Sequence, residues 1–375
     1  MSAAEPLLPL SGAPVAAERW CQRLAAEASQ TRVLLLLGGT ETAAVPGISA
    51  AGATPESRRY TAAADAEYLL RGPHHSPQVP LPELPAGVSP AVIARAVVEG
   101  LALEPWLVDL GVPVPPAVPH LSLGQRPARC LSTGQALGLE RTRQLWQLGR
   151  RWGERLARSG QPILLAECVP GGTTTALAVL EGLGIRAAGL VSGSQRQPDH
   201  QLKARLVAQG LEAAGLQGSA EPERVLAALG DPMQPLAAGL VQAAAQAGTP
   251  LLLAGGSQMA AVLAVALAAT EPSRRPELAA QAAVVTTAWL AQERSSNLSA
   301  LLARLGERWG VEPLGFAAAL RFSGSSSPEL QAYEQGFVKE GVGAGGLAAL
   351  WQLSGRGCSD LVLACEQACH VLRQT

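Results

Sequence analysis

Charged side chains are scarce in this sequence of 375 residues, and basic residues form no block. Lys, Arg, Asp and Glu make up 16% of the chain, and the formal net charge is −1. That fraction lies below the roughly 25% that is usual in soluble domains. A protein that neutralises nucleic-acid phosphates concentrates basic residues, so we expect no nucleic-acid partner. The low charge favours extensive burial or an interface between subunits.

The six cysteines lack the CxxC spacing of a common zinc site. Cys365, Cys369 and His370 stand close together near the end of the chain. We interpret them as part of a packed helix in which the thiols stay reduced, because cysteine packs as a small hydrophobic residue. The sequence therefore predicts no metal site and no cofactor.

The sequence predicts neither a secretory signal peptide nor a membrane-spanning helix. The first residues have no basic region of the kind that opens a signal peptide. The apolar stretch 251–269 is interrupted by Gly255 and Gly256, which favours a buried strand, a turn and a helix over a membrane span. We expect a cytoplasmic protein without a membrane partner.

Short apolar runs alternate with helical stretches along most of the chain, a pattern typical of a mainly parallel sheet with right-handed crossovers. Helices are expected over 15–30, 90–101 and 134–158. The predicted strands are 33–37, 106–109, 163–166, 187–191, 251–254, 283–286 and 315–320. We predict an α/β fold with a Rossmann-like large domain over 31–334. Residues 1–30 and 335–375 are expected to form a smaller, mostly helical domain.

The segment 167–175, ECVPGGTTT, follows one predicted strand and precedes a helix. Glycines allow a sharp turn and a close approach of the backbone to a ligand. The N-terminus of the helix favours an anion, and the threonines add hydroxyl donors. The segment matches neither a Walker A motif nor GxGxxG. We interpret it as a phosphate-binding loop, with an ordinary turn between strand and helix as the alternative.

Two further segments contain candidate functional residues. Residues 339–346, KEGVGAGG, hold four glycines, and Glu340 at their edge would gain a raised pKa if it is partly desolvated, as a general base requires. Lys203 lies in a predicted helix whose buried side we assign to Leu202 and Leu206. It could reach a phosphate or remain a solvated surface lysine.

Taken in order, these segments resemble the nicotinate-nucleotide:dimethylbenzimidazole phosphoribosyltransferase family. The resemblance covers roughly residues 85–355, and its most specific parts are 167–175 together with Glu340-Gly341-Val342-Gly343-Ala344. It implies transfer of the ribose 5-phosphate of nicotinate mononucleotide to an aromatic base, with release of nicotinate, in cobamide assembly. It also implies a homodimer.

The resemblance implies roles for individual residues as well. Glu340 corresponds to the general base of the family, and Glu167 would lie near the ribose or the nicotinate. The residues that the resemblance assigns to substrate binding are Ser89, Glu167, Gly171, Gly172, Thr173, Thr174, Lys203, Gly341 and Gly343.

The chain departs from the family pattern at three places. It has Gly38-Gly39-Thr40-Glu41 where the family has Gly-Asp-His-Gly, and Ala94-Arg95 where the family has a glutamine near the aromatic base. A late His-rich stretch is replaced by residues 321–325, RFSGS. Benzimidazole, adenine and a phenol therefore remain possible acceptors.

Two alternatives to catalysis of this kind remain open. The altered base region favours a nucleotide-binding sensor or assembly partner without activity, whereas Glu340 favours an enzyme. A nicotinamide-dependent oxidoreductase would need the GxGxxG turn and a distal acidic residue, which the sequence lacks.

Overall fold

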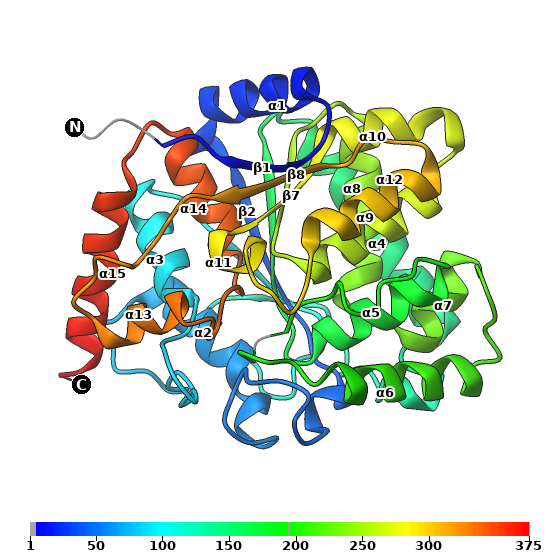
Figure 1. Cartoon of the computed structure of the whole chain (residues 1–375), viewed down its shortest axis with the longest axis horizontal. Helices are drawn as coiled ribbons and strands as arrows, with labels where there is room; N and C mark the ends of the chain where they lie inside the picture. The colour runs from blue at the N-terminus through cyan, green and yellow to red at the C-terminus, as the bar shows by residue number, and fades with distance from the viewer. Residues whose placement is uncertain (1–4, 194, 375) are drawn as a thin grey trace.

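An eight-stranded sheet forms the centre of the computed structural model, which describes residues 5–193 and 195–374 (Figure 1). The strand order is β1-β8-β7-β6-β5-β2-β3-β4. β1 runs antiparallel to β8, and every other neighbouring pair is parallel. The strands are β1 (Leu8–Ser11), β2 (Arg32–Leu37), β3 (Trp106–Asp109), β4 (Leu121–Ser122), β5 (Ile163–Cys168), β6 (Leu251–Ala254), β7 (Ala282–Thr287) and β8 (Leu314–Ala318). The predicted α/β class is confirmed.

Both faces of the sheet are covered, which explains why its strands are continuous apolar runs. Along β2, Leu34 and Leu36 enter one hydrophobic core, whereas Leu35 and Leu37 enter the other. The first core is closed by α4 (Leu139–Ala157), α5 (Gly172–Gly182), α6 (His200–Ala213), α7 (Pro222–Leu229), α8 (Met233–Gln246), α9 (Ser257–Ala268) and α12 (Leu298–Trp309).

The opposite core lies under α1 (Pro14–Ala26), α2 (Thr61–Arg71), α3 (Ala91–Gly100), α13 (Pro328–Glu334), α14 (Ala344–Leu353) and α15 (Cys358–Leu372). Two short helices flank β7, namely α10 (Arg275–Gln281) and α11 (Ala288–Ala291). Figure 1 shows α4, α5, α8 and α9 on one side of the sheet, and α2, α3, α14 and α15 on the other.

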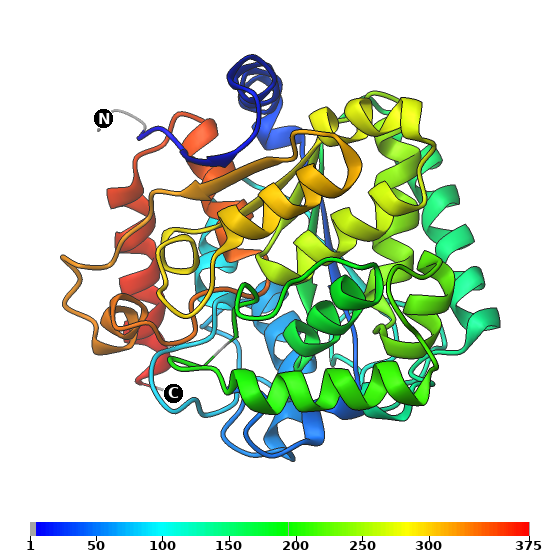
Figure 2. The same cartoon turned by 45° about the vertical axis from the view of Figure 1, so that its right-hand side comes forward.

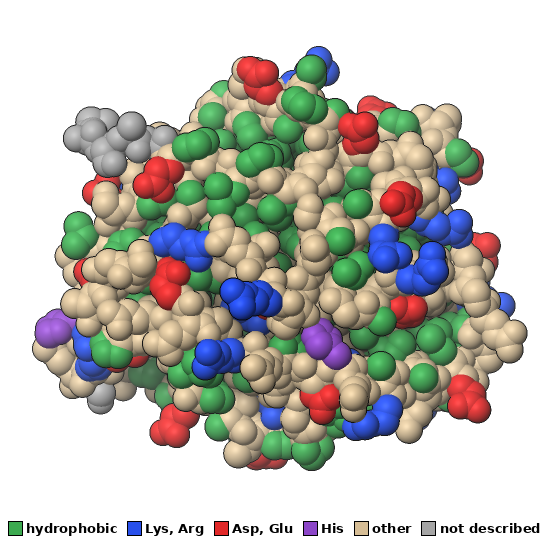
Figure 3. All heavy atoms as spheres, in the orientation of Figure 1, with side chains coloured by type: hydrophobic (Ala, Val, Ile, Leu, Met, Phe, Trp, Pro, Cys, Tyr) green, Lys and Arg blue, Asp and Glu red, His purple; other side chains and the backbone are tan. Residues whose placement is uncertain are grey.

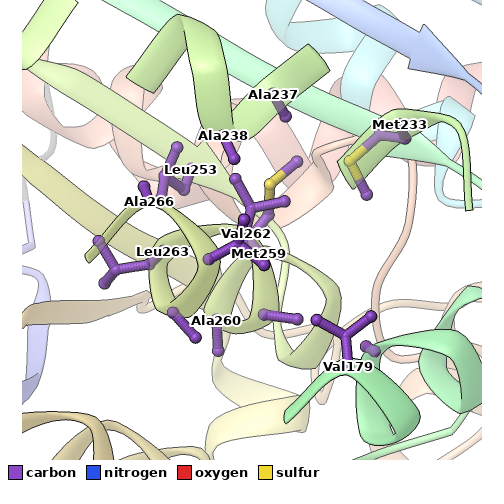
Figure 4. Close-up of a cluster of buried hydrophobic side chains, with 14 of the residues drawn as sticks. Val179, Met233, Ala237, Ala238, Leu253, Met259, Ala260, Val262, Leu263 and Ala266 are labelled. Atoms are coloured by element: carbon purple, nitrogen blue, oxygen red, sulfur yellow. The ribbon is translucent and has the colours of Figure 1, made fainter. Parts of the chain in front are cut away.

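Helix α9 is the centre of the first core (Figure 4). Its side chains Met259, Val262 and Leu263 lie among those of α8 and of Leu253 on β6. Every residue from Ser257 to Leu267 in this helix is buried, so the apolar stretch that follows Gly256 serves as core. None of the described helices is long and apolar enough to cross a membrane.

The chain changes direction within the sheet at β2 and β5. From β2 it proceeds outward to β3 and β4, and then returns to place β5 on the other side of β2 before continuing to β6, β7 and β8. In open parallel sheets, ligands bind beyond the carboxyl ends of the strands at such a reversal. The loops that follow β2 and β5 therefore border the expected ligand site.

Two local predictions were wrong. Residues 187–191 contain a turn over 188–190 and no strand, because the N–H groups of Ala187 and Ala188 both donate to Glu181 Oε1. The helix predicted over 134–158 begins only at Leu139, after Gly134 and Gly138 adopt positive φ angles of 65° and 80°. Cys365 and Cys369 are buried free thiols on α15, as predicted.

The predicted division into two domains stays a prediction. Helix α14 packs against β6, β7 and β8, and it also contacts α1. The ring of Trp20 on α1 stacks on Phe316 of β8 at 5.2 Å. The two ends of the chain therefore share contacts with each other and with the sheet.

Candidate functional site

The loop after β5 forms the first wall of the site. Glu167 lies near the end of β5, Gly171 takes a left-handed conformation with φ of 80°, and α5 begins at Gly172. The predicted order of strand, glycine turn and helix is confirmed. Thr173 faces the cavity described next, whereas Thr174 is buried with an Oγ1 that has no hydrogen-bond partner among the described residues.

A cavity of about 110 Å³ lies beside this loop. Residues far apart in the sequence meet there, because the parallel strands β5, β6 and β7 all end at the same edge of the sheet. The predicted site residues that line the cavity are Ser89, Glu167, Gly171, Gly172, Thr173, Glu340 and Gly341. Lys203 does not line the cavity but contacts Thr173, which does. Gly343 lies outside the lining as well, where the start of α14 packs against Ala166 and Ala254.

The segment before α14 has an unusual backbone. Val338, Lys339 and Val342 have φ angles of 66°, 57° and 54°, in the left-handed region that side chains other than glycine rarely adopt. Such conformations cost about 1–3 kcal/mol each and persist only where the surroundings hold them. Lys339 stabilises the segment, because its buried ammonium group pairs with Glu293 and donates to the carbonyl of Gln195. The strained segment fixes the direction of Glu340.

Four donors surround the carboxylate of Glu340. Thr286 Oγ1 and the N–H of Thr287 donate to Oε2 at 2.8 and 2.9 Å, and the N–H groups of Gly341 and Gly345 donate to Oε1 at 3.1 Å. Gly345 lies in the first turn of α14, so the helix dipole also favours a negative charge here. Only glycine fits at that position, since a Cβ atom would lie 2.5 Å from Oε2.

Glu167 and Glu340 share the cavity but differ in their surroundings. Burial, followed by the charge of Glu340, raises the pKa of Glu167 to about 8, although hydrogen bonds from the N–H of Val169, at 3.2 Å, and from the Gln258 side chain act to lower it. Burial also raises the pKa of Glu340 above its usual value, but four donors oppose that effect. Glu167 therefore keeps its proton to higher pH than a free glutamate, whereas the four donors around Glu340 favour its ionised form.

The stability of the protein should reveal the proton on Glu167. Because its pKa is about 8 in the folded state against an ordinary 4.5, the native protein holds a proton that the unfolded chain loses above pH 4.5. The stability of the wild type should therefore fall as pH rises from about 4.5 to 8, by an amount on the order of a few kcal/mol. Glu167→Gln keeps the neutral form and should lack this loss.

Thermal unfolding of both proteins at pH 5 and pH 8.5 tests this expectation. The Tm of Glu167→Gln relative to the wild type should be clearly higher at pH 8.5 than at pH 5. The matched control is Glu277→Gln, at an exposed carboxylate on α10, which should show no such change. A Tm difference for Glu167→Gln that does not depend on pH would contradict a neutral Glu167.

Lys203 is buried, which corrects the expected orientation of α6. The buried face of the helix consists of Lys203, Val207 and Gly210, whereas Leu202 and Leu206 are half-exposed. Asp199 caps the helix through the N–H of Leu202, and Figure 2 shows α6 running beside the loop of residues 41–60. The predicted buried side was wrong because it was assigned from the apolar Leu202 and Leu206, whereas the helix buries the face of Lys203.

The ammonium group of Lys203 points at the loop after β5. It donates to Thr173 Oγ1 and to the carbonyl of Ser192, each at 2.9 Å. Burial, followed by the charge of Lys339, lowers the pKa of Lys203 to about 8. An anion at this wall would compensate the buried charge.

Asp65 was missed by the sequence analysis. It lines the cavity, accepts from Ser89 Oγ at 2.5 Å and from Cys168 Sγ at 3.3 Å, and burial raises its pKa to about 6. It lies within the alanine-rich sequence of α2, which contains no motif, so only the fold brings it to Ser89.

No group of three or more His, Cys, Asp or Glu side chains in residues 5–193 and 195–374 is placed to hold a metal ion. On the face seen in Figure 3, basic and acidic side chains are interspersed rather than gathered by sign.

The chain is similar to known proteins both in sequence and in fold. A sequence profile described as phosphoribosyltransferase matches residues 89–295, which is more than half of the chain. The chain belongs to the nicotinate-nucleotide:dimethylbenzimidazole phosphoribosyltransferase family, a family of pentosyltransferase enzymes. The family predicted from the sequence motifs is confirmed.

Its relatives include proteins of cyanobacteria that carry the name UPF0284. One from Prochlorococcus marinus (strain MIT 9313) is 50% identical, covering 97% of this chain and 92% of the relative. UPF0284 protein glr4139 of Gloeobacter violaceus is 49% identical, covering 94% of this chain and 91% of the relative.

Among solved structures, the chain resembles CobT from Thermus thermophilus, with a TM-score of 0.55 and 18% identity over 96% of this chain and 92% of the other. A second structure from the same organism, a nicotinate-nucleotide-dimethylbenzimidazole phosphoribosyltransferase, gives a TM-score of 0.54 at 18% identity, over 96% of this chain and 91% of the other. At this level of identity, the likeness shows a shared fold.

Proposed function

We propose that this protein transfers the ribose 5-phosphate of nicotinate mononucleotide to an aromatic base and releases nicotinate. The observation that carries the proposal is the meeting in one cavity of Glu340, whose carboxylate has four hydrogen-bond donors, and Glu167, whose pKa burial raises, next to the loop that Lys203 contacts. Two carboxyl groups held in opposite protonation states supply a base and a hydrogen-bond donor in one site.

The phosphate would lie against the N-terminus of α5. Thr173 Oγ1 and Lys203 Nζ are the donors proposed to hold it, together with the backbone of Gly171 and Gly172. A fixed phosphate would turn the anomeric carbon of the ribose toward the acceptor. We propose that Ser89 and Gly341, which line the cavity, contact the substrate, and that the buried Thr174 and Gly343 hold the surrounding backbone in place.

The proposed reaction exchanges one bond to the anomeric carbon for another. The bond to the nicotinate nitrogen breaks, and its electron pair neutralises the pyridinium ring. A ring nitrogen of benzimidazole or adenine, or the hydroxyl oxygen of a phenol, bonds to the carbon, and Glu340 accepts the proton that the acceptor then loses. Neutral Glu167 would tolerate the carboxylate of nicotinate nearby, whereas an ionised Glu167 would repel it.

Glu340 must free a lone pair before it can accept a proton, because four donors already occupy the carboxylate. Three of these donors are backbone N–H groups and cannot turn away. The hydroxyl of Thr286 can rotate, which would open Oε2 to the acceptor and then let Thr286 accept from the protonated carboxyl.

Thr286→Val should therefore move the pH dependence of the reaction. The Thr286 hydroxyl stabilises the ionised form of Glu340 and so lowers its pKa. Without it, the acidic limb of the kcat profile should shift to higher pH. A profile identical to that of the wild type would exclude Thr286 from this role.

The function is tested by incubating the protein with nicotinate mononucleotide and an acceptor, and separating the products by chromatography. Benzimidazole, adenine and phenol represent the three acceptor classes. Release of nicotinate that depends on one of them supports the enzyme. Tight binding of nicotinate mononucleotide by calorimetry, with no release for any acceptor, would favour a nucleotide-binding sensor.

We further propose that the protein is a homodimer in the cytoplasm. The charged fraction of 16% supports an extended apolar interface. Sedimentation equilibrium should give twice the chain mass of 38.5 kDa, and a monomer at micromolar concentration would contradict the dimer.

A further inference from the structure

A second cavity lies on the other side of the loop after β5. It measures about 1110 Å³, ten times the volume of the cavity that holds Glu340. It opens beyond the carboxyl ends of β2 and β3. Gly38, which follows β2, and Val112, which follows β3, both line it. Among the described residues, Pro170 alone lines both cavities. Nothing in the proposed transfer reaction uses this space.

The walls of this cavity concentrate positive charge. Its arginines are Arg58, Arg59, Arg126, Arg129, Arg141 and Arg224, against two acidic residues, Glu41 and Glu56. Six positive and two negative charges give the lining a formal charge of +4, although the whole chain carries −1. A cleft with one sign of charge attracts ligands of the opposite sign.

Most of these guanidinium groups are not neutralised within the protein. Within residues 5–193 and 195–374, only Arg59 of the six is in an ion pair, at 3.8 Å from Glu56. Arg58 donates to the carbonyls of Ala43 and Val45, and Arg141 donates to the carbonyl of Arg126. These neutral acceptors orient the side chains and leave their charge available.

Arg141 provides a second sign of a missing ligand. Its Nε is buried and has no hydrogen-bond partner in the part of the chain that the structure describes. A buried donor without a partner costs about 1–3 kcal/mol. An anionic oxygen in the cavity would remove that cost.

The remaining walls are apolar. Val112, Leu137, Leu139 and Leu216 line the cavity, and Leu139 is 44% exposed to it and to solvent. The volume exceeds what a free phosphate requires and suits a larger organic molecule. Arginine forks match phosphate oxygens in pairs.

We infer that this cavity binds an organic di- or triphosphate, at a site separate from that of nicotinate mononucleotide. The phosphates would lie among the exposed Arg126, Arg129 and Arg224, with Arg58 and Arg141 behind them. The organic part would cover Leu137 and Leu139. Occupation of this site would stabilise the loop that contains Pro170, which both cavities share.

Isothermal titration calorimetry of the full chain with ATP as the probe tests this inference. The variant Arg129→Ala/Arg224→Ala removes two exposed arginines of the cavity, and we expect its Kd for ATP to be at least tenfold higher than that of the wild type. The control Arg143→Ala/Arg150→Ala removes the same charge from exposed positions on α4 outside the cavity and should bind ATP like the wild type. Adenosine should not bind at the same concentrations.

Four results would overturn the inference. The first is no binding of ATP by the wild type, and the second is an equal loss of affinity in both double variants. The third is full competition between ATP and nicotinate mononucleotide, which would place ATP in the smaller cavity. Citrate, added as a polyanion without phosphate, should bind more weakly than ATP, and equal affinity would contradict a phosphate site.

Discussion

Glu340→Gln should lower kcat by about 100-fold or more, with little change in the KM for nicotinate mononucleotide, because a positioned general base contributes about 10²- to 10⁴-fold. Glutamine has nearly the same shape but cannot accept the proton that the acceptor loses. The contacts between the protein and the phosphate and ribose of the substrate would remain, so the KM should change little. Steady-state release of nicotinate at several concentrations of both substrates separates kcat from KM.

The same substitution at Glu167 provides the matched comparison. Because Glu167 is neutral at pH 7, a glutamine there resembles the native group, and its loss of kcat should be smaller than that of Glu340→Gln. In Glu340→Gln, the amide NH₂ group would face donors on either side, namely the N–H groups of Gly341 and Gly345 or the donors of Thr286 and Thr287. Circular dichroism must therefore show that the variant is folded. A folded Glu340→Gln variant with wild-type kcat would remove Glu340 from the base role.

Lys203→Met should raise the KM for nicotinate mononucleotide by about 10- to 100-fold, the effect of losing a hydrogen bond between charged groups worth about 1.5–3 kcal/mol. Methionine fills much of the buried volume of the lysine stem but has no ammonium group. The effect on kcat should be smaller, since Lys203 holds the phosphate rather than the reacting atoms.

Arg205→Met is the control for this variant, because Arg205 is exposed two residues further along α6. It should leave the KM unchanged. If Lys203→Met and Arg205→Met both match the wild type, the phosphate does not lie at this end of the loop. Calorimetric titration with nicotinate mononucleotide gives the same comparison without turnover.

The sheet could be predicted from the sequence because parallel strands buried on both faces read as continuous apolar runs. β3 and β6 have the expected bounds, and β2, β5 and β7 differ by one or two residues at their ends. The stretch 187–191 has the same apolar composition, but Glu181 captures two of its N–H groups, and tertiary contacts of that kind leave no periodic signal.

The site was only partly visible in the sequence. The segments that contain Glu167 and Glu340 are local motifs, and the sheet brings them together because β5 and α14 are neighbours. Asp65 and the six arginines of the larger cavity come from distant segments of the chain and form no sequence motif. Their proximity follows from the fold alone, and so does the burial of Lys203.

The strain before α14 also escaped the sequence analysis. Valine and lysine do not favour positive φ angles, so nothing in the residues of 338–342 predicts three of them. The structure holds them through the ion pair of Lys339 with Glu293 and through Thr287, which donates to the carbonyl of Lys339. Local preference is overridden here by buried contacts that direct Glu340 into the cavity.

The most direct test of the central claim is the mass balance of a single reaction. Phosphorus NMR follows the 5-phosphate from nicotinate mononucleotide into a new nucleotide, while chromatography measures nicotinate in the same sample. With an aromatic acceptor present, nicotinate and the new nucleotide should appear in equal amounts, and neither should form without the acceptor. Nicotinate released with free ribose 5-phosphate, or no release with benzimidazole, adenine or phenol, would contradict phosphoribosyl transfer.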